Sequence, residues 1–291
     1  MKKVFFLLFL SLLIFTSCTQ KSTQELKIST NSWIGYAPLF YAQEKGYLKE
    51  INTKLITNVS LAESTSLYNV RKADMITATQ HEYYALKKNG HNIIPIILLD
   101  RSNGGDMVLS NKTIAEIQKA NKVEAYLEID SINAEVIESF LKYYAIDTNK
   151  IEFINKDQAQ LQDLQNDPSK TLIIVSYSPY DIKLKKNGFK VIASTRDANS
   201  IFVIDAIFTD AKIAKKEHQR LVKLKTIIDR SIEEMNRDTK ASYLLVKDFL
   251  ENLSYNEYLE SLKLIKWISK PSQKLLEAIK PMGFNKNDLI I

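Results

Sequence analysis

The feature that most constrains the fold of this chain is a regular alternation of short strand-like runs and amphipathic helix-like runs after residue 25. Helix-like runs that lie between such strands predict βαβ units and a mainly parallel sheet, because parallel strands need a crossover connection. The expected fold class is therefore α/β. The predicted strands are Leu26–Thr30, Thr53–Val59, Asp74–Thr79, Asn92–Leu99, Val123–Leu127, Ile151–Asn155, Thr171–Ser176, Lys190–Ala193 and Ile201–Thr209.

Two polar runs divide this alternation into two lobes. The run Asp100–Asp106 contains Gly104–Gly105, the only adjacent glycines in a chain that has seven glycines, and glycine supplies the backbone freedom that a hinge needs. The run Thr195–Ser200 would carry the chain back. Two crossings predict a clamshell, with lobe 1 formed by residues 26–103 and 200–291 and lobe 2 by residues 104–199. Ligands of open α/β sheets bind beyond the carboxyl ends of the strands, which would face the cleft.

The first eighteen residues predict export and lipid attachment. Lys2 and Lys3 precede an apolar run from Val4 to Phe15, which is typical of a secretory signal peptide. The segment ends in FTSC, which resembles the lipobox of bacterial lipoproteins. This resemblance implies a signal peptide at residues 1–17, a diacylated Cys18 that anchors the protein in the membrane, and a polar tether at residues 18–25. Cys18 is the only cysteine, so neither an intrachain disulfide nor a thiolate metal site is expected.

Charge and motifs argue against nucleic-acid binding and catalysis. The formal net charge of +6 is spread along the sequence, which is typical of a solvated surface and not of a nucleic-acid-binding stripe. The histidines are scattered, and the run HEYYA lacks the second histidine of a zinc-protease motif. G-x-S-x-G, P-loop and G-x-G-x-x-G motifs are absent. We therefore expect no enzyme, no metal, no cofactor and no nucleic-acid partner.

Five motifs, in order along the chain, resemble the periplasmic substrate-binding proteins of ABC importers. The branch is the one that includes binders of aliphatic sulfonates, taurine, nitrate and thiamine-precursor pyrimidines. The motifs are W-x-G-Y-x-P-L-x-x-A-x-x-K-G-Y from Trp33 to Tyr47, ADMITATQHEYYAL, LLDRSNGGDMVLS with Gly105 where the family has alanine, VSYSPY and FVIDAIF. The resemblance implies a type II periplasmic-binding-protein fold without catalysis. It also implies a monomer in the periplasm or extracellular space that delivers a small solute to the transmembrane permease subunits.

Aromatic and acidic residues in these motifs are candidates for ligand binding. Trp33 and Tyr36 would form a stacking wall for a flat or cationic ligand, or they would pack as core residues. Gly35 would let a ligand approach the backbone, and the helix that begins near Pro38 would offer free N–H groups to an anion. Asp205 lies in the middle of an apolar strand, where a carboxylate is costly unless it is paired or faces the cleft.

The remaining candidates each have a structural alternative, because polar side chains at these positions also cap helices and turns. Asp106 would bind a cationic group or cap backbone N–H groups. Ser131 and Asn133 begin a predicted helix whose N-terminus would attract an oxyanion. The full set of predicted ligand-binding residues is Trp33, Gly35, Tyr36, Thr79, Gln80, Asn103, Gly105, Asp106, Ser131, Asn133, Ser176, Tyr177 and Asp205.

The sequence thus predicts an extracytoplasmic solute-binding lipoprotein of an ABC importer. Helix N-termini favour a small anionic or zwitterionic solute such as a sulfonate, nitrate or taurine. The aromatic and acidic candidates would instead suit a cationic or heterocyclic solute, such as a thiamine-precursor pyrimidine. A tethered ligand-sensing domain for a membrane receptor is a further alternative.

Overall fold

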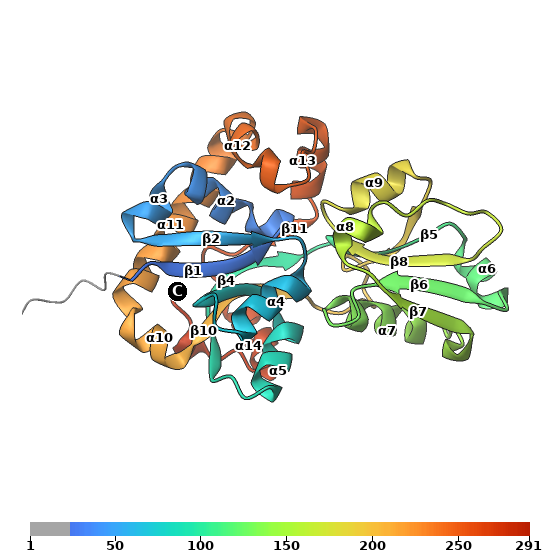
Figure 1. Cartoon of the computed structure of the whole chain (residues 1–291), viewed down its shortest axis with the longest axis horizontal. Helices are drawn as coiled ribbons and strands as arrows, with labels where there is room; N and C mark the ends of the chain where they lie inside the picture. The colour runs from blue at the N-terminus through green and yellow to red at the C-terminus, as the bar shows by residue number, and fades with distance from the viewer. Residues whose placement is uncertain (1–23) are drawn as a thin grey trace, which may run out of the picture.

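The computed structural model describes residues 24–291, which fold into two lobes joined by two crossings of the chain (Figure 1). Each lobe has its own sheet and its own apolar core. The predicted α/β clamshell with two crossings is confirmed. The predicted signal peptide, Cys18 and most of the predicted tether lie outside the described residues.

The sheet of lobe 1 has six strands in the order β11-β4-β10-β3-β1-β2. Strands β1, β2, β3 and β4 run in the same direction, and β10 and β11 run antiparallel to their neighbours. The carboxyl ends of the first four strands and the start of β10 therefore lie at one edge, which faces lobe 2. The strands are β1 (Leu26–Asn31), β2 (Thr53–Asn58), β3 (Met75–Thr79), β4 (Ile93–Ser102), β10 (Ile204–Asp210) and β11 (Ile265–Trp267).

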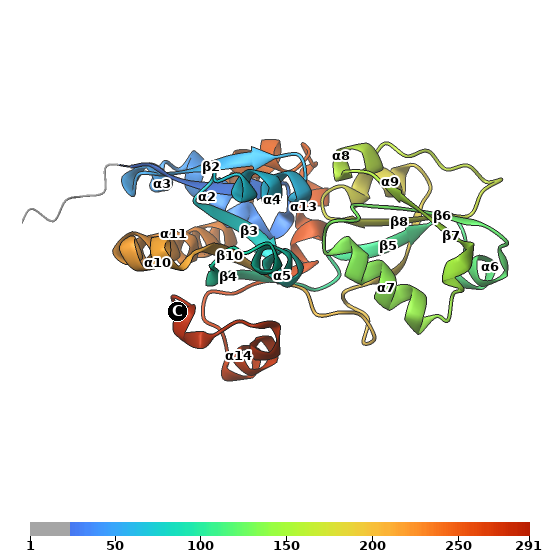
Figure 2. The same cartoon turned by 60° about the horizontal axis from the view of Figure 1, so that its bottom comes forward.

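Helices cover both faces of this sheet (Figures 1 and 2). On one face, α2 (Ala37–Glu44), α11 (His218–Arg237) and α12 (Thr239–Val246) enclose the largest apolar core. The other face packs against α4 (Leu61–Asn69), α5 (Gln80–Lys88) and α14 (Gln273–Ile279). Shorter helices complete the lobe: α3 (Tyr47–Glu50), α10 (Ala211–Lys216) and α13 (Tyr255–Leu262).

The sheet of lobe 2 has five strands in the order β7-β6-β8-β5-β9. Because β5 begins at the crossing and β8 runs antiparallel to it, the start of β5 and the end of β8 meet at the edge that faces lobe 1. The strands are β5 (Asp106–Ser110), β6 (Val123–Leu127), β7 (Ile151–Asn155), β8 (Leu172–Tyr177) and β9 (Lys190–Ser194). The helices are α6 (Ile114–Lys119), α7 (Asn133–Tyr143), α8 (Gln158–Leu161) and α9 (Asp181–Lys186).

The two crossings lie side by side and are joined by hydrogen bonds. The hydroxyls of Ser102 and Thr195 are 2.6 Å apart, and the Thr195 hydroxyl also accepts from the backbone N–H of Gly104 at 2.8 Å. Gly104 has a φ of +108°, which glycine adopts without strain. Arg196 donates to the Asn103 carbonyl at 3.1 Å, so the predicted hinge residues serve the connection between the lobes.

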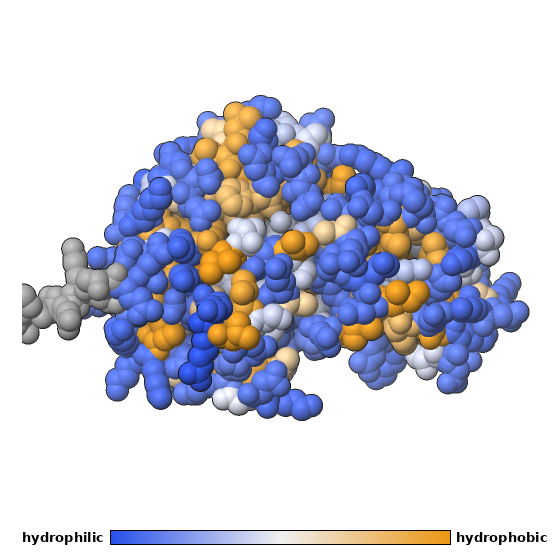
Figure 3. Space-filling model, in the orientation of Figure 1, coloured by the Kyte–Doolittle hydropathy of each residue, from blue (hydrophilic) through white to orange (hydrophobic). Residues whose placement is uncertain are grey.

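The surface is mainly hydrophilic, as expected for a chain whose charges are mixed along the sequence. Hydrophilic side chains cover most of the face in Figure 3, with smaller apolar areas between them on both lobes. Among residues 24–291, none of the helices combines the length and the apolar composition that crossing a bilayer requires.

Candidate functional site

A small cavity of about 20 Å³ lies between the lobes, where the strand ends of both sheets meet. Lobe 1 contributes the end of β1, the 3₁₀ turn Ile34–Tyr36, the end of β3 and the start of α4 and β10. Lobe 2 contributes the start of β5, the end of β8 and the start of α7. The lining residues are Asn31, Trp33, Tyr36, Leu61, Thr79, Asp106, Ile132, Tyr177 and Asp205.

Two buried carboxylates lie next to each other at the lobe 1 side of this cavity. Asp205 near the start of β10 is directly opposite Asp100 on β4, and opposite residues of antiparallel strands point to the same face. Their side chains are only 3% and 0% exposed. Like charges in this arrangement repel, so the pair is stable only with hydrogen-bond donors, a shared proton or a cation.

The segment that follows β1 supplies a donor to each of these carboxylates. The Trp33 indole Nε1 donates to both Asp100 oxygens, at 3.2 and 3.3 Å. The Tyr36 hydroxyl donates to Asp205 Oδ1 at 2.6 Å. The second Asp205 oxygen, Oδ2, has no hydrogen-bond partner among residues 24–291, although it is buried beside the cavity.

A third buried carboxylate, Asp106, comes from lobe 2. Its backbone N–H donates to the Ser102 hydroxyl, while its Oδ2 atom lacks a hydrogen-bond partner in the described part of the chain. Burial, with a smaller contribution from the negative charge of Glu82, raises the pKa of Asp106 to about 6, against the lowering effect of the Ser102 hydrogen bond. The cavity thus has carboxylates from both lobes.

Burial also raises the pKa of Asp100 and that of Asp205 well above their ordinary range. The charges of Asp100 and Asp106 raise the pKa of Asp205 further, and the hydrogen bond from Tyr36 opposes them. No lysine, arginine or histidine lies among the residues that line the cavity. Without a bound cation, only protons can neutralise the buried carboxylates. The site is therefore electrostatically suited to a positively charged ligand.

Aromatic and amide groups form the rest of the wall. The rings of Trp33 and Tyr177 are 5.8 Å apart in an edge-to-face arrangement. Asn31 on β1 donates to the Tyr177 hydroxyl on β8 at 3.1 Å, which joins the two lobes. The Asn31 Oδ1 atom is a further buried acceptor for which the described residues offer no donor. Aromatic faces and unpaired oxygens are the groups that bind organic cations.

Of the two helix N-termini that were expected to attract an anion, the start of α7 has its first donors occupied, as does the neighbouring start of α5, whereas the start of α2 has no side-chain cap. Glu82 accepts from the backbone N–H of Thr79 at 3.0 Å and from that of Ile132, just before α7, at 2.9 Å. The next N–H of α7, from Asn133, donates to the Ser131 hydroxyl at 3.2 Å. Oxygen atoms of the chain itself therefore already occupy the backbone donors that an anion would use at α5 and α7.

The thirteen predicted ligand-binding residues fall into two groups. Six of them line the cavity between the lobes: Trp33, Tyr36, Thr79, Asp106, Tyr177 and Asp205. The other seven do not line it: Gly35, Gln80, Asn103, Gly105, Ser131, Asn133 and Ser176.

The two glycines make room for protein side chains. A Cβ atom on Gly35 would lie 2.1 Å from Asp100 Oδ2 and 2.3 Å from Trp33 Nε1, so the absence of a side chain permits the indole–carboxylate contact. A Cβ atom on Gly105 would lie 2.3 Å from the Trp33 ring. Both glycines thus position the tryptophan and carboxylate of the site.

The polar residues outside the lining bind other parts of the chain. Gln80 bridges to the backbone of β10 and of the segment before it, through Ile204 N–H and the Phe202 carbonyl. Ser176 and Asn133 both hydrogen-bond to the buried side chain of Gln158, each at 2.8 Å. These contacts hold the walls of the cavity in place.

Sequence reasoning missed the carboxylates of Asp100 and Glu82 and the amide of Asn31. Asp100 is the third residue of the motif LLDRSNGGDMVLS, which also contains Asp106, so the motif itself carried a signal for it. Asn31 follows the first predicted strand, at a sheet edge where ligands bind. Glu82 also lies in a motif, ADMITATQHEYYAL, and its spacing from Thr79 is that of a capping box, but its contact with the other lobe had no local signal.

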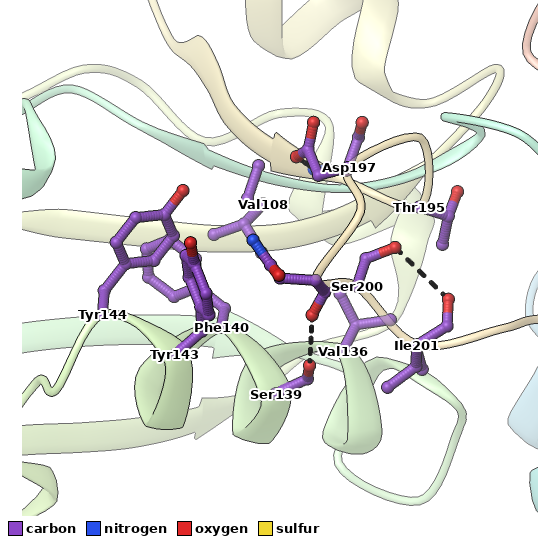
Figure 4. Close-up of a pocket in the computed structure, with 13 residues that line it drawn as sticks. Val108, Val136, Ser139, Phe140, Tyr143, Tyr144, Thr195, Asp197, Ser200 and Ile201 are labelled. Carbon is purple, nitrogen blue, oxygen red and sulfur yellow. Dashed lines mark hydrogen bonds between the residues drawn. The ribbon is translucent and has the colours of Figure 1, made fainter.

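A second cavity, of about 40 Å³, lies in lobe 2 beside the return crossing (Figure 4). Phe140, Tyr143 and Tyr144 of the α7 region line one part of it. Its polar groups are satisfied within the chain: Ser139 donates to the Asn199 carbonyl, and the backbone of Ser194 donates to Asp197. It therefore lacks the unpaired buried oxygens of the cavity between the lobes. Within the described residues, no group of three or more histidine, cysteine, aspartate or glutamate side chains could hold a metal ion.

Comparison with solved structures finds the same fold at low sequence identity. The ligand-binding component of an ABC-type import system from Staphylococcus aureus, described with zinc bound, has a TM-score of 0.70 and 16% identity, over 92% of this chain and 97% of that chain. The periplasmic aliphatic sulphonate binding protein SsuA from Escherichia coli has a TM-score of 0.70 and 12% identity, over 90% and 91%. The periplasmic nitrate-binding protein NrtA from Synechocystis PCC 6803 has a TM-score of 0.63 and 10% identity, over 81% and 69%.

The chain thus has the two-lobed fold that these periplasmic binding proteins and import-system components share. The family model described as NMT1/THI5 like matches residues 33–241, and the chain belongs to this family. A search of curated proteins finds no match. SsuA and NrtA are described as binding proteins and the Staphylococcus aureus structure as a ligand-binding component, which agrees with the expected class.

Proposed function

We propose that this chain is the extracytoplasmic solute-binding component of an ABC importer, and that its solute carries a positive charge. The observation that carries the proposal is the set of buried, unpaired oxygens at the cavity between the lobes, from Asp106, Asp205 and Asn31. An isolated buried carboxylate is costly, and a bound cation would remove this cost. The permease would then receive the solute from the closed clamshell.

The two lobes would hold the cation from opposite sides. Asp205, supported by Asp100, would bind it from lobe 1, and Asp106 would bind it from lobe 2. Closure would bring these carboxylates around the charge and exclude water, which strengthens the attraction. Trp33 and Tyr177 would add aromatic surface on which an organic cation can rest.

Sulfonate, nitrate and taurine remain alternatives because SsuA and NrtA are described as sulphonate and nitrate binders. The lining of the cavity has no cationic side chain. The backbone N–H groups at the starts of α5 and α7 already donate to oxygen atoms of the chain. An anion would therefore meet carboxylates without a compensating positive charge. The electrostatics thus support the cationic or heterocyclic alternative.

Thermal-shift and calorimetric titrations of the purified chain test this proposal. The solutes are primary amines, guanidinium compounds, quaternary ammonium compounds and aminopyrimidines, compared with alkanesulfonates, taurine and nitrate. A cation at about 100 times its Kd should stabilise the protein by about 2.7 kcal/mol and raise the Tm by roughly 5–10 °C. Asp205→Asn should abolish this rise, whereas the exposed Asp248→Asn should not.

Each outcome of this comparison has a distinct meaning. A Tm rise with anions alone would overturn the cationic solute but keep the binding-protein assignment. If none of the solutes raised the Tm at saturating concentration, the binding function itself would be contradicted.

We also propose that the protein is a lipoprotein, anchored through Cys18 with its body outside the cytoplasmic membrane. The support is the FTSC run after an apolar signal segment. Acyl chains on one cysteine give stable anchoring, since each buried methylene contributes about 0.8 kcal/mol. Wild-type protein should sediment with membranes and incorporate labelled fatty acid, and Cys18→Ser should do neither. If the Cys18→Ser protein still incorporated labelled fatty acid and sedimented with membranes, lipid attachment at Cys18 would be contradicted.

A further inference from the structure

Glu128 is a buried carboxylate that the site described above does not use. It follows β6 at the edge of the lobe 2 sheet that faces lobe 1, and it is 2% exposed. Neither of its oxygens, Oε1 or Oε2, has a hydrogen-bond partner within residues 24–291. Burial, with the charges of Glu82 and Asp157, raises the pKa of Glu128 to about 8, although the Gln158 backbone and the Ser60 side chain oppose this rise. Gln158 and Ser60 are thus near Glu128 but outside hydrogen-bond geometry, and a buried carboxylate so weakly compensated carries a desolvation cost that a bound cation would remove.

Glu128 lines a pocket of about 240 Å³ that opens between the two lobes. The pocket is mainly acidic, because Asp130 and Asp157 also line it. Lys156 is the one cationic residue in its lining, and it donates no hydrogen bond to Glu128. The pocket thus combines a negative surface with an unsatisfied buried carboxylate.

This pocket borders the cavity between the lobes. Ala62 of α4 lines the pocket, and the preceding residue, Leu61, lines the cavity. Glu128 is also close enough to Tyr177 for its charge to raise the pKa of that tyrosine, after the larger effect of burial. Tyr177 lines the cavity, so Glu128 lies near the wall of the first site.

The two volumes suit different parts of one ligand. A cavity of about 20 Å³ has room for a group the size of a water molecule, which is also the size of an ammonium head group. The neighbouring pocket, about 240 Å³, has room for an alkyl chain and a second polar group. The acidic groups thus lie in two neighbouring volumes that meet at the start of α4.

We propose that Glu128 forms a second cation-binding subsite and that the solute is a linear molecule with two positively charged amino groups. One ammonium group binds between Asp106 and Asp205, and the other binds Glu128 in the larger pocket. The chain between them passes Tyr177 and Leu61. This inference rests on the proposed function, since it assumes that the first cavity binds a cation.

Calorimetry with diamines and matching monoamines tests the second subsite. The probes are putrescine and cadaverine against butylamine and pentylamine, with wild-type protein and with Glu128→Gln. A second charge-assisted contact should make each diamine bind at least about tenfold more tightly than its monoamine. Glu128→Gln should reduce diamine affinity to the monoamine level and leave monoamine affinity unchanged. Glu152→Gln on the neighbouring strand, where the exposed carboxylate pairs with Lys122, is the matched control and should change neither affinity.

The possible results separate this proposal from the proposed function. Equal affinities of monoamine and diamine for wild-type protein would overturn the second subsite and keep the cationic solute. An equal loss of both affinities in Glu128→Gln would also overturn it, because a general electrostatic effect would then explain the loss. If no amine bound to wild-type protein, the cationic solute and the second subsite would both be contradicted.

Discussion

At the scale of single residues, the site depends on carboxylates that the free protein holds at a cost. Asp100 and Asp205 lie opposite each other, and Asp106 approaches from the other lobe. Burial raises the pKa of all three. Sites that bind a charged ligand commonly have such unfavourable electrostatics when they are empty. Replacement of one of the charged binding residues then stabilises the protein but removes binding.

Asp106→Asn should therefore stabilise the solute-free protein at neutral pH and weaken solute binding. Burial raises the pKa of Asp106 from 3.8 to about 6, so the folded chain binds more protons than the unfolded chain between these values, and its stability falls as pH rises through this window. The neutral amide avoids this loss, which is on the order of 1–3 kcal/mol at pH 7. Thermal unfolding should show a Tm higher by a few degrees at pH 7 and a smaller difference near pH 4.

Asp248→Asn is the control for this substitution, because Asp248 is exposed on lobe 1. It should change neither the Tm nor the affinity. A lower Tm of Asp106→Asn at pH 7 would show that the carboxylate has a stabilising role that the structure does not explain.

Gly35→Ala should prevent solute binding. Its Cβ atom would lie 2.1 Å from Asp100 Oδ2, well inside van der Waals contact, and overpacking of this kind costs roughly 1–3 kcal/mol or more. The alanine would push Asp100 and Trp33 apart. Gly46→Ala is the control: it strains a residue with a φ of +76°, but no atom lies within 4 Å of the added Cβ. Calorimetry should show lost affinity for Gly35→Ala alone, and wild-type affinity of that variant would refute the proposed contact.

At the scale of secondary-structure elements, Glu82 joins helices of the two lobes. One oxygen closes the capping box at the start of α5 with Thr79, and the other accepts from the backbone of Ile132 before α7. A capping box normally serves a single helix. Here the same carboxylate also provides an acceptor for the other lobe, so α5 and α7 are connected only when the clamshell is closed.

Glu82→Ala should shift the clamshell toward open forms and lower solute affinity by about tenfold, because a hydrogen bond to a charged group contributes roughly 1.5–3 kcal/mol. Glu116→Ala is the matched control, since Glu116 forms the same capping box with Thr113 at the start of α6, entirely within lobe 2. Both substitutions should lower the Tm. Calorimetry should show a change of affinity for Glu82→Ala alone, and equal affinities in the two variants would exclude a role of Glu82 in closure.

At the scale of the whole molecule, closure brings acidic groups of both lobes together. His81 on α5 and Glu135 on α7 form the nearest compensating pair, with Nδ1 and Oε1 2.7 Å apart. The hydrogen bond to Glu135 raises the pKa of His81, although partial burial opposes this. The solute-free closed form therefore depends on protons at both the carboxylates and the histidine.

The radius of gyration of the solute-free protein should increase between pH 5 and pH 8. The raised pKa of Asp106, about 6, and that of Glu128, about 8, mean that both carboxylates lose their protons in this range and repel those of lobe 1. The pKa of His81 is raised. The protonated His81 therefore contributes to closure at low pH, and this contribution is lost as the pH rises through the raised pKa. Small-angle X-ray scattering measures the change, and a saturating cationic solute should suppress it. A radius that is independent of pH would contradict electrostatic control of closure.

Sequence alone was sufficient for the α/β class, the two crossings and the family, because these depend on local periodicity and on motifs in a fixed order. It did not predict the short edge strand β11, the helix α6 or most of the helix α10. Short elements and helix junctions depend on packing against distant residues more than on local pattern.

Within the site, sequence determined which chemical groups stand at the ends of strands, including Trp33, Tyr36, Asp106 and Asp205. Only the tertiary structure decided what they do together. Asp100 becomes the partner of Asp205 through the pairing of β4 with β10, and Glu82 meets α7 through the approach of the two lobes. The reason is physical: a pKa shift or an unpaired oxygen arises from burial and from neighbours that lie far apart in the chain, and no local pattern of residues records those distances.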